Sequence, residues 1–156
     1  MGQDPLIMTV TECLNAEHDV FLLQLCVLER MLEERLSADD VRACALMLAA
    51  AVERHRDVEE ELLYPEILRR FGQDFPPMRV MEAEHKEIER CVVGLRDRTG
   101  NAADLARRFV AVLRDHIQKE MQVLFPMAES RIPAAELRQM AERCAAKRHC
   151  AAHGHA

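Results

Sequence analysis

Two histidine and glutamate pairs recur in the sequence at the same spacing. His55 is followed by Glu59 after three intervening residues, and the same spacing separates His116 from Glu120. Residues four apart lie on one face of a helix, one turn above the other. An imidazole and a carboxylate arranged in this way can bind the same cation. One such pair in a chain this charged is usually a solvated surface pair, so the recurrence is the informative feature.

The repeat extends beyond these pairs. A proline follows each glutamate at the same distance, Pro65 in the first half and Pro126 in the second, and segments 16–18 and 83–85 both read Ala-Glu-His. Each half therefore supplies two histidines and one carboxylate. Two such sets are enough for two metal ions bridged by carboxylates, and the donor types suit iron, manganese or zinc without choosing among them. The predicted metal ligands are His18, His55, Glu59, His85, His116 and Glu120.

Helices must position these residues, and the composition favours helices. Only five glycines and six prolines occur among 156 residues. Thr9, Ser37 and Asn101 each precede an acidic residue by three positions, which predicts three helix starts. The Pro76-Pro77 pair predicts a fourth start, because proline suits the first turn of a helix. The predicted helices span residues 10–36, 39–70, 77–98, 102–130 and 134–148.

Each of the four long helices carries an apolar stripe at three- and four-residue spacing, which is typical of a face that packs into a core. One histidine interrupts each stripe. Burying a carboxylate beside it costs several kcal/mol unless something compensates the charge, and a metal ion would do so. The predicted stripes contain Leu14, Phe21, Leu25, Leu28 and Leu32; Val41, Leu48, Val52 and Leu62; Met78, Met81, Ile88, Val92 and Leu95; and Leu105, Phe109, Val112, Val123 and Met127.

Distances from the predicted turns place the histidines at matching heights. His18 and His55 are nearly equidistant from the turn expected after residue 36, and His85 pairs with His116 in the same way. The second and third helices match less well, and we expect a kink at Pro65 to absorb the difference. Four long helices with short connections predict an all-α, antiparallel up-down-up-down four-helix bundle with a short C-terminal extra helix.

The length and a hydrophobic content of 49% suit one folded unit. We expect residues 1–9 to be an N-terminal extension, residues 10–130 to be the bundle, and residues 131–156 to be a short helix with a flexible tail that contains cysteines and histidines. The sequence leaves open whether Met1 or Met8 is the natural start.

Composition argues against several classes of protein. A net charge of −6 without a long basic run offers nucleic acid little attraction. The longest uncharged apolar run, residues 43–52, is too short to span a membrane, and the first residues lack the features of a signal peptide. We therefore expect a cytoplasmic protein with no nucleic acid or membrane partner. The irregularly spaced cysteines are expected to be reduced.

Several alternatives stay open. Tyr64 could be a hydrogen-bond or redox partner of the metal site, but its repeat counterpart Phe125 favours a packing role. A ferritin-like carboxylate site needs two Glu-x-x-His motifs, and only Glu82-x-x-His85 fits. A metal-free bundle or a structural zinc protein would also satisfy the pattern. A further soft-metal site in the tail would use Cys144, His149, Cys150, His153 and His155.

Over about residues 12–130 the order of motifs resembles the hemerythrin family, in its HHE cation-binding branch: one histidine, then His-x3-Glu, then one histidine, then His-x3-Glu. The resemblance implies an up-down-up-down bundle with a non-heme di-iron centre. It implies that His18 and His55 bind one iron, that His85 and His116 bind the other, and that the two glutamates of the motifs bridge them.

Two departures separate the chain from the oxygen-carrying hemerythrins. Those proteins have another histidine four positions from the one in the third helix, where this chain has Met81 and Glu89, and their last bridging carboxylate is an aspartate five positions after its histidine. Fewer histidines leave more open coordination positions, unless Glu82 or Glu89 supplies a ligand.

The resemblance implies binding of dioxygen, nitric oxide or peroxide for sensing, buffering or detoxification, with an unidentified redox or signalling partner protein. The alternatives it implies are an iron donor that repairs damaged iron centres, and an enzyme that turns over peroxide or nitric oxide.

Overall fold

The computed structural model describes the backbone of residues 8–153 and the side chains of residues 8–146. Within that part of the chain every regular element is helical, which confirms the all-α fold class, and no helix is long and apolar enough to cross a membrane. The elements are α1 (Val10–Glu33), α2 (Ala38–Val58), the π-helical turn η1 (Glu59–Leu63), α3 (Tyr64–Phe71), α4 (Pro76–Asp97), α5 (Ala102–Lys119), the π-helical turn η2 (Glu120–Leu124), α6 (Phe125–Arg131) and α7 (Ala134–His153).

The predicted helix starts are confirmed by their capping contacts. Thr9 and Glu12 form a reciprocal capping box, in which each side chain accepts a backbone N–H of the other. The side chains of Ser37 and Asn101 accept the N–H groups of the residues three positions later, both at 3.1 Å. Helix α4 begins at Pro76. These contacts satisfy backbone donors that the first turn of a helix leaves unpaired.

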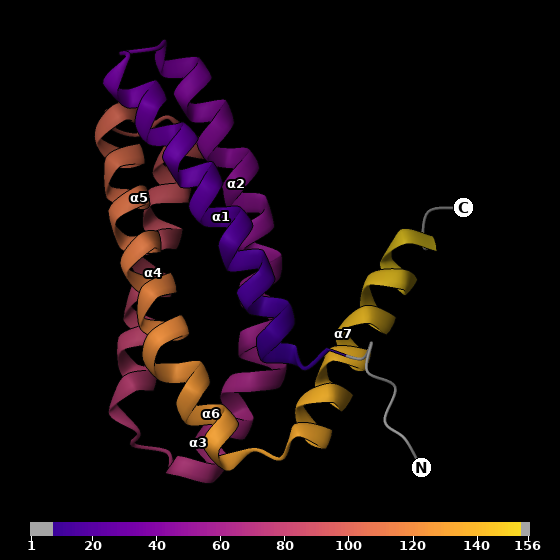
Figure 1. The fold of residues 1–156 in the computed structure, drawn as a ribbon. Helices are drawn as coiled ribbons and strands as arrows, with labels where there is room; N and C mark the ends of the chain where they lie inside the picture. The colour runs from indigo at the N-terminus through magenta and orange to yellow at the C-terminus, as the bar shows by residue number, and fades with distance from the viewer. Residues whose placement is uncertain (1–7, 154–156) are drawn as a thin grey trace.

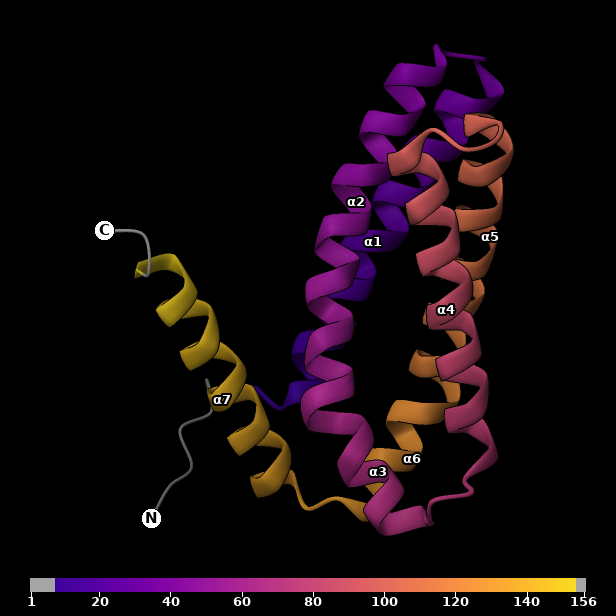
Figure 2. The ribbon, with the colours of Figure 1, turned by 180° about the vertical axis from the view of Figure 1, so that it is seen from behind.

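Four long helices lie side by side: α1, α2, α4 and α5 (Figures 1 and 2). Helix α1 packs on α2 and α5, and α4 packs on α2 and α5. Short turns join α1 to α2 and α4 to α5. Each turn contains an arginine in the left-handed region, Arg35 at φ 53° and Arg98 at φ 57°, which lets the chain reverse direction directly after the helix.

A π-helical turn lies immediately before Pro65, where a kink was expected. The N–H of Tyr64 donates to the carbonyl of Glu59, five residues back, and the N–H of Phe125 donates to the carbonyl of Glu120 in the same way. Proline lacks an N–H and its ring clashes with the carbonyl four residues earlier, so a wider turn with one extra residue accommodates it. Both turns begin at a predicted metal ligand.

The apolar stripes of the first three long helices are confirmed, because every predicted member is buried. The fourth stripe was partly wrong: Val123 is 48% exposed, while Leu124 and Ala128 are buried. The extra residue in η2 moves the buried face along by one position, from 123 to 124 and from 127 to 128. The other members of that stripe that are only half-buried are Leu105, Val112 and Met127.

Helix α7 is longer than predicted and extends to His153. It lies at an angle beside the first turns of α1, outside the group of four long helices (Figures 1 and 2). Leu137 and Met140 of α7 are buried in the same apolar cluster as Val10 and Leu14 of α1. The C-terminal helix is therefore packed onto the rest of the molecule.

Candidate metal centre

The six predicted metal ligands meet in the interior, although they come from all four long helices and both π-helical turns. All six residues are buried, with exposed fractions of 5% or less. His55 and His116 lie in the last turns of α2 and α5, so the glutamate that follows each of them is the first residue of a π-helical turn. The positions are His18 on α1, His55 on α2, Glu59 in η1, His85 on α4, His116 on α5 and Glu120 in η2.

His18 and His55 form one side of this cluster. The Nε2 atom of His18 lies 3.1 Å from an oxygen of Glu120, and the Nε2 atom of His55 lies 2.9 Å from an oxygen of Glu59. One donor atom from each of these four residues can be chosen so that all four atoms lie within 4.8 Å of one another. Four donors at this separation surround a space that suits one metal ion.

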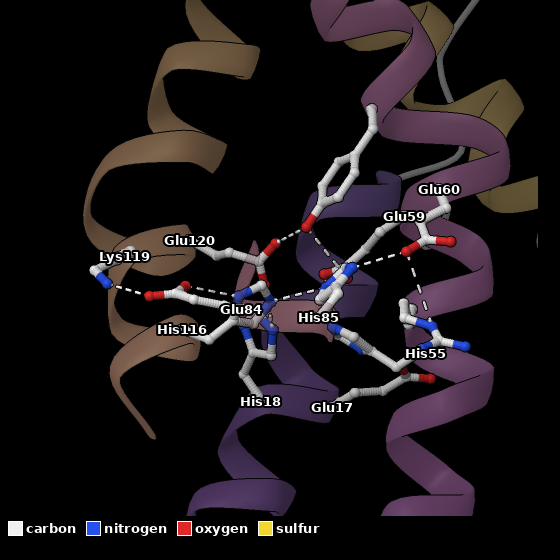
Figure 3. Close-up of polar contacts among 12 residues, drawn as sticks. Glu17, His18, His55, Glu59, Glu60, Glu84, His85, His116, Lys119 and Glu120 are labelled. Carbon is white, nitrogen blue, oxygen red and sulfur yellow. Dashed lines mark hydrogen bonds and ion pairs between the residues drawn. The ribbon is translucent and has the colours of Figure 1, made fainter. Parts of the chain in front are cut away.

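His85 and His116 form the other side (Figure 3). Their Nε2 atoms are 3.1 Å apart. The second oxygen of Glu59 lies 3.4 Å from Nε2 of His85, and the oxygen of Glu120 that faces His18 also lies 3.4 Å from Nε2 of His116. Each glutamate therefore faces both histidine pairs, which is the arrangement that a bridging carboxylate requires.

The donor atoms fit a metal ion better than they fit one another. Among the described residues, Nε2 of His18 and His55, one oxygen of Glu59 and one of Glu120 have no hydrogen-bond partner, although the histidine and carboxylate atoms approach within 3.1 Å. The short approaches lack hydrogen-bond alignment. Buried polar atoms left unpaired are costly, and a cation among nitrogen and oxygen donors would satisfy them.

Three further glutamates, which sequence reasoning missed as functional residues, lie behind the histidines (Figure 3). A carboxylate accepts only, so each Nδ1–H donates and each Nε2 is left facing the centre. The Nδ1 atoms pair as follows: His55 with Glu17 at 2.7 Å, His85 with Glu60 at 2.8 Å, and His116 with Glu84 at 3.1 Å. The recurrence of Ala-Glu-His was a signal for two of these glutamates, because Glu17 and Glu84 are its middle residues.

The side chain of Tyr64 corrects the preference for a packing role alone. Its ring is buried and stacks on His85, and its hydroxyl donates to Glu120 at 2.6 Å. The same hydroxyl lies 3.4 Å from Glu59. Tyr64 therefore holds a predicted bridging carboxylate in place, a contact that Phe125 lacks the hydroxyl to make.

Charge inside the cluster is compensated by the residues themselves. Burial lowers the pKa of His55, but the charge of Glu59 and the hydrogen bond that His55 donates to Glu17 outweigh it and raise that pKa to about 10. Burial raises the pKa of the Glu59 carboxyl, but His55 outweighs burial and holds it well below its usual range. A divalent cation would replace these protons as the positive charge.

A small cavity of about 20 Å³ lies directly against the histidines. That is room for a molecule about the size of water. Apart from the ligands, its walls come from all four long helices and are mostly apolar, with Glu53, Arg56 and Glu89 as the charged wall residues. The apolar wall residues are Phe21, Ala49, Val52, Ile88, Val92, Leu113 and Ile117.

The remaining candidates are not among the converging donor atoms, although Glu89 lines the small cavity beside the histidines. Glu82 and Glu89 are exposed and belong to neither group of converging donor atoms among the described side chains. Their groove is lined also by Arg56, Lys86 and His85. The tail site was to use Cys144, which packs against the core, together with His149, Cys150, His153 and His155, whose side chains lie outside the described residues.

Comparison with known proteins identifies the class. The family model of the hemerythrin HHE cation-binding domain matches residues 8–128. The chain therefore belongs to the hemerythrin HHE cation-binding family. Comparison with curated proteins and with solved structures gives no match. The buried histidine and glutamate cluster is consistent with the cation binding that the family description names.

Proposed function

We propose that this chain is a non-heme di-iron protein that binds dioxygen or a related small ligand, such as nitric oxide or peroxide, for sensing, buffering or detoxification. The observation that carries the proposal is the small, mostly apolar cavity placed directly against a buried set of four imidazoles and two carboxylates. A bound iron pair would supply ferrous and ferric states and open coordination positions. In this proposal residues 10–130 form an up-down-up-down bundle around the iron pair.

The side chains of the site have separate roles in this proposal. His18 and His55 would hold one iron, His85 and His116 the other, and the two carboxylates would bridge them. The cavity is too small for larger organic molecules, and its mostly apolar walls favour a neutral diatomic ligand over a charged one. In a cytoplasmic setting, signalling or electron supply would come from a partner protein, with no role for nucleic acid or membranes.

Iron counting on ligand variants tests the site. Purified protein loaded anaerobically with ferrous iron is expected to hold two irons per chain and to change its optical spectrum on exposure to oxygen. His116→Ala and Glu120→Gln each remove a converging donor, so both should lower the iron content and abolish the spectral response. Glu129→Gln, at an exposed position on α6, is the control and should behave as the wild type. Retention of both iron and response in the ligand variants would refute the assignment.

Narrowing the cavity tests its role separately from metal binding. Ala49 is buried and lines the cavity, whereas the neighbouring Ala50 on the same helix is exposed. Ala49→Val should slow oxygen or nitric oxide binding by roughly 10-fold, which corresponds to about 1.4 kcal/mol, while the iron content stays at two. Ala50→Val should leave the rate unchanged. Equal rates in both variants would mean that the ligand does not use this cavity.

A further inference from the structure

The four buried histidines are not held equally. The Nδ1 atoms of His55, His85 and His116 each pair with a carboxylate. His18 is completely buried, and neither of its ring nitrogens has a hydrogen-bond partner among the described residues. In the pair His85 and His116, both rings are therefore held by a carboxylate at Nδ1. In the pair His18 and His55, only His55 is held in this way.

The sequence repeat explains the difference, because it is broken at one position. Glu17 and Glu84 are repeat counterparts, and they support His55 and His116, which are counterparts too. The carboxylate that supports His85 is Glu60, the residue after Glu59. The residue after Glu120 is Met121, whose thioether is at best a weak acceptor. The second half thus lacks the carboxylate that would correspond to Glu60.

Further contacts strengthen the supported side. Lys119 forms ion pairs with Glu84 and with Asp115, so the carboxylate behind His116 is itself held in place. The ring of Tyr64 stacks on His85 at 5.7 Å, and its hydroxyl is bonded to Glu120. The ring that stacks on His18 is the counterpart Phe125, at 5.5 Å, which has no polar group. The ion pairs of Lys119 and the stacking of Tyr64 favour the His85 and His116 side, whereas Glu120 faces both pairs.

We propose that the two metal positions differ in lability: the ion held by His85 and His116 is retained, and the ion held by His18 and His55 is released and exchanged readily. The inference rests on the proposed metal centre. A carboxylate behind a metal-bound histidine fixes the ring and raises its basicity, and loss of one typically weakens metal binding 10- to 100-fold. The same ratio is expected between the release rates at the two positions.

Unequal lability bears on the alternative function of this chain. A donor that repairs damaged iron centres must give up iron while its own fold survives. An ion bound by His18 and His55 could leave while the ion on His85 and His116 still neutralises both carboxylates. The structure therefore suits delivery of one ferrous ion per chain.

Release of iron to a coloured chelator tests the inference. Wild-type protein carrying two ferrous ions, mixed anaerobically with excess chelator, should lose them in two phases of equal amplitude whose rates differ by about 10- to 100-fold. A single phase that carries both ions would overturn the inference while leaving the proposed metal centre intact. Failure to bind any iron would instead refute the proposed function, so the two failures are distinguishable.

A variant that makes the first half match the second identifies the residue responsible. Glu60→Met removes the carboxylate behind His85 and should accelerate the slow phase until it approaches the fast one. Glu129→Met introduces the same residue type at an exposed position on α6 and should leave both phases unchanged. A slow phase unaffected by Glu60→Met would overturn the assignment.

A measurement on the wild type avoids any effect of substitution on folding. One equivalent of Zn²⁺ added to metal-free protein should perturb the imidazole NMR signals of His85 and His116 before those of the other pair. Filling of the His18 and His55 position first, or equal filling of both positions, would overturn the inference.

Discussion

At the residue scale, Tyr64 gives the two halves of the repeat different chemistry. Burial and the nearby carboxylates Glu59 and Glu120 raise the pKa of its phenol well above its ordinary value. The hydroxyl therefore keeps its proton and remains a hydrogen-bond donor to Glu120. This bond leaves the other oxygen of Glu120 directed at His18 and His116. Tyr64 is thus a positioning residue for a predicted bridging ligand.

Replacing Tyr64 by phenylalanine, the residue at the equivalent position of the second half, isolates this hydrogen bond. Tyr64→Phe should lower the free energy of unfolding of the metal-free protein by about 1.5 to 3 kcal/mol, the usual contribution of a hydrogen bond to a charged group. Iron content should remain at two per chain, because no metal ligand is removed. Urea unfolding and iron analysis check both expectations. An unchanged free energy of unfolding would mean that the hydroxyl of Tyr64 does not contribute to stability and that the residue acts by packing alone.

What the sequence could reveal at this scale follows from the repeat. The six predicted ligands were identifiable because each recurs, and the structure brings all six together. The hydrogen bond of Tyr64 was considered from the sequence, but its counterpart Phe125 favoured packing, and only the structure shows the hydroxyl bonded to Glu120. The role of Glu60 was not predictable for a related reason. Its counterpart in the second half is Met121, so the repeat gives no sign of it, and its partner His85 lies on another helix.

At the element scale, capping contacts explain the successes of helix prediction, and the π-helical turns explain part of its errors. Helix starts follow from local capping contacts, so they were predictable. A π-helical turn adds one residue to a helix, and periodicity alone gives no sign of where it is added. The exposed Val123 lies inside η2, but Leu105 and Val112 before it are also only half-buried, so the π-helical turn accounts for part of the error in that stripe.

Deleting a residue tests whether η2 contains one extra residue in an otherwise continuous helix. Removing the exposed Gln122 should restore regular helix and keep Leu124 and Ala128 buried. The deletion is combined with Pro126→Ala, because proline inside a regular helix costs about 3 kcal/mol. The combined variant should change the free energy of unfolding by no more than about 1 kcal/mol, the size of an ordinary surface change, as measured in urea.

A deletion in regular helix provides the control. Ala111 is exposed in the middle of α5, and its removal should rotate one half of that helix by about 100° relative to the other. Leu113 and Ile117 would then leave the core, at about 1.5 to 3 kcal/mol each. If the deletions at Gln122 and Ala111 destabilise the protein equally, the interpretation that η2 contains one extra residue would be wrong.

At the scale of the whole molecule, α7 ties the C-terminal segment to the outer side of the metal centre. It packs beside α1, and a cavity of about 130 Å³ at this junction is lined by Glu17 together with Cys13 and Cys144. Glu17 is the carboxylate behind His55. The sequence predicted this helix but not its packing partner, because an apolar face of a helix does not specify which other face it meets.

Weakening the α7 contact should destabilise the molecule without emptying the metal centre. Leu137 of α7 is almost fully buried in the apolar cluster that also contains Val10 and Leu14 of α1, so Leu137→Ala should reduce the free energy of unfolding by about 2 to 5 kcal/mol. Gln139→Ala, at an exposed position of the same helix, should leave the stability within about 0.5 kcal/mol of the wild type. Both variants should still bind two irons, because all six predicted ligands lie between α1 and η2. Loss of iron in Leu137→Ala but not in Gln139→Ala would mean instead that α7 holds Glu17, and through it His55, in the position that metal binding requires.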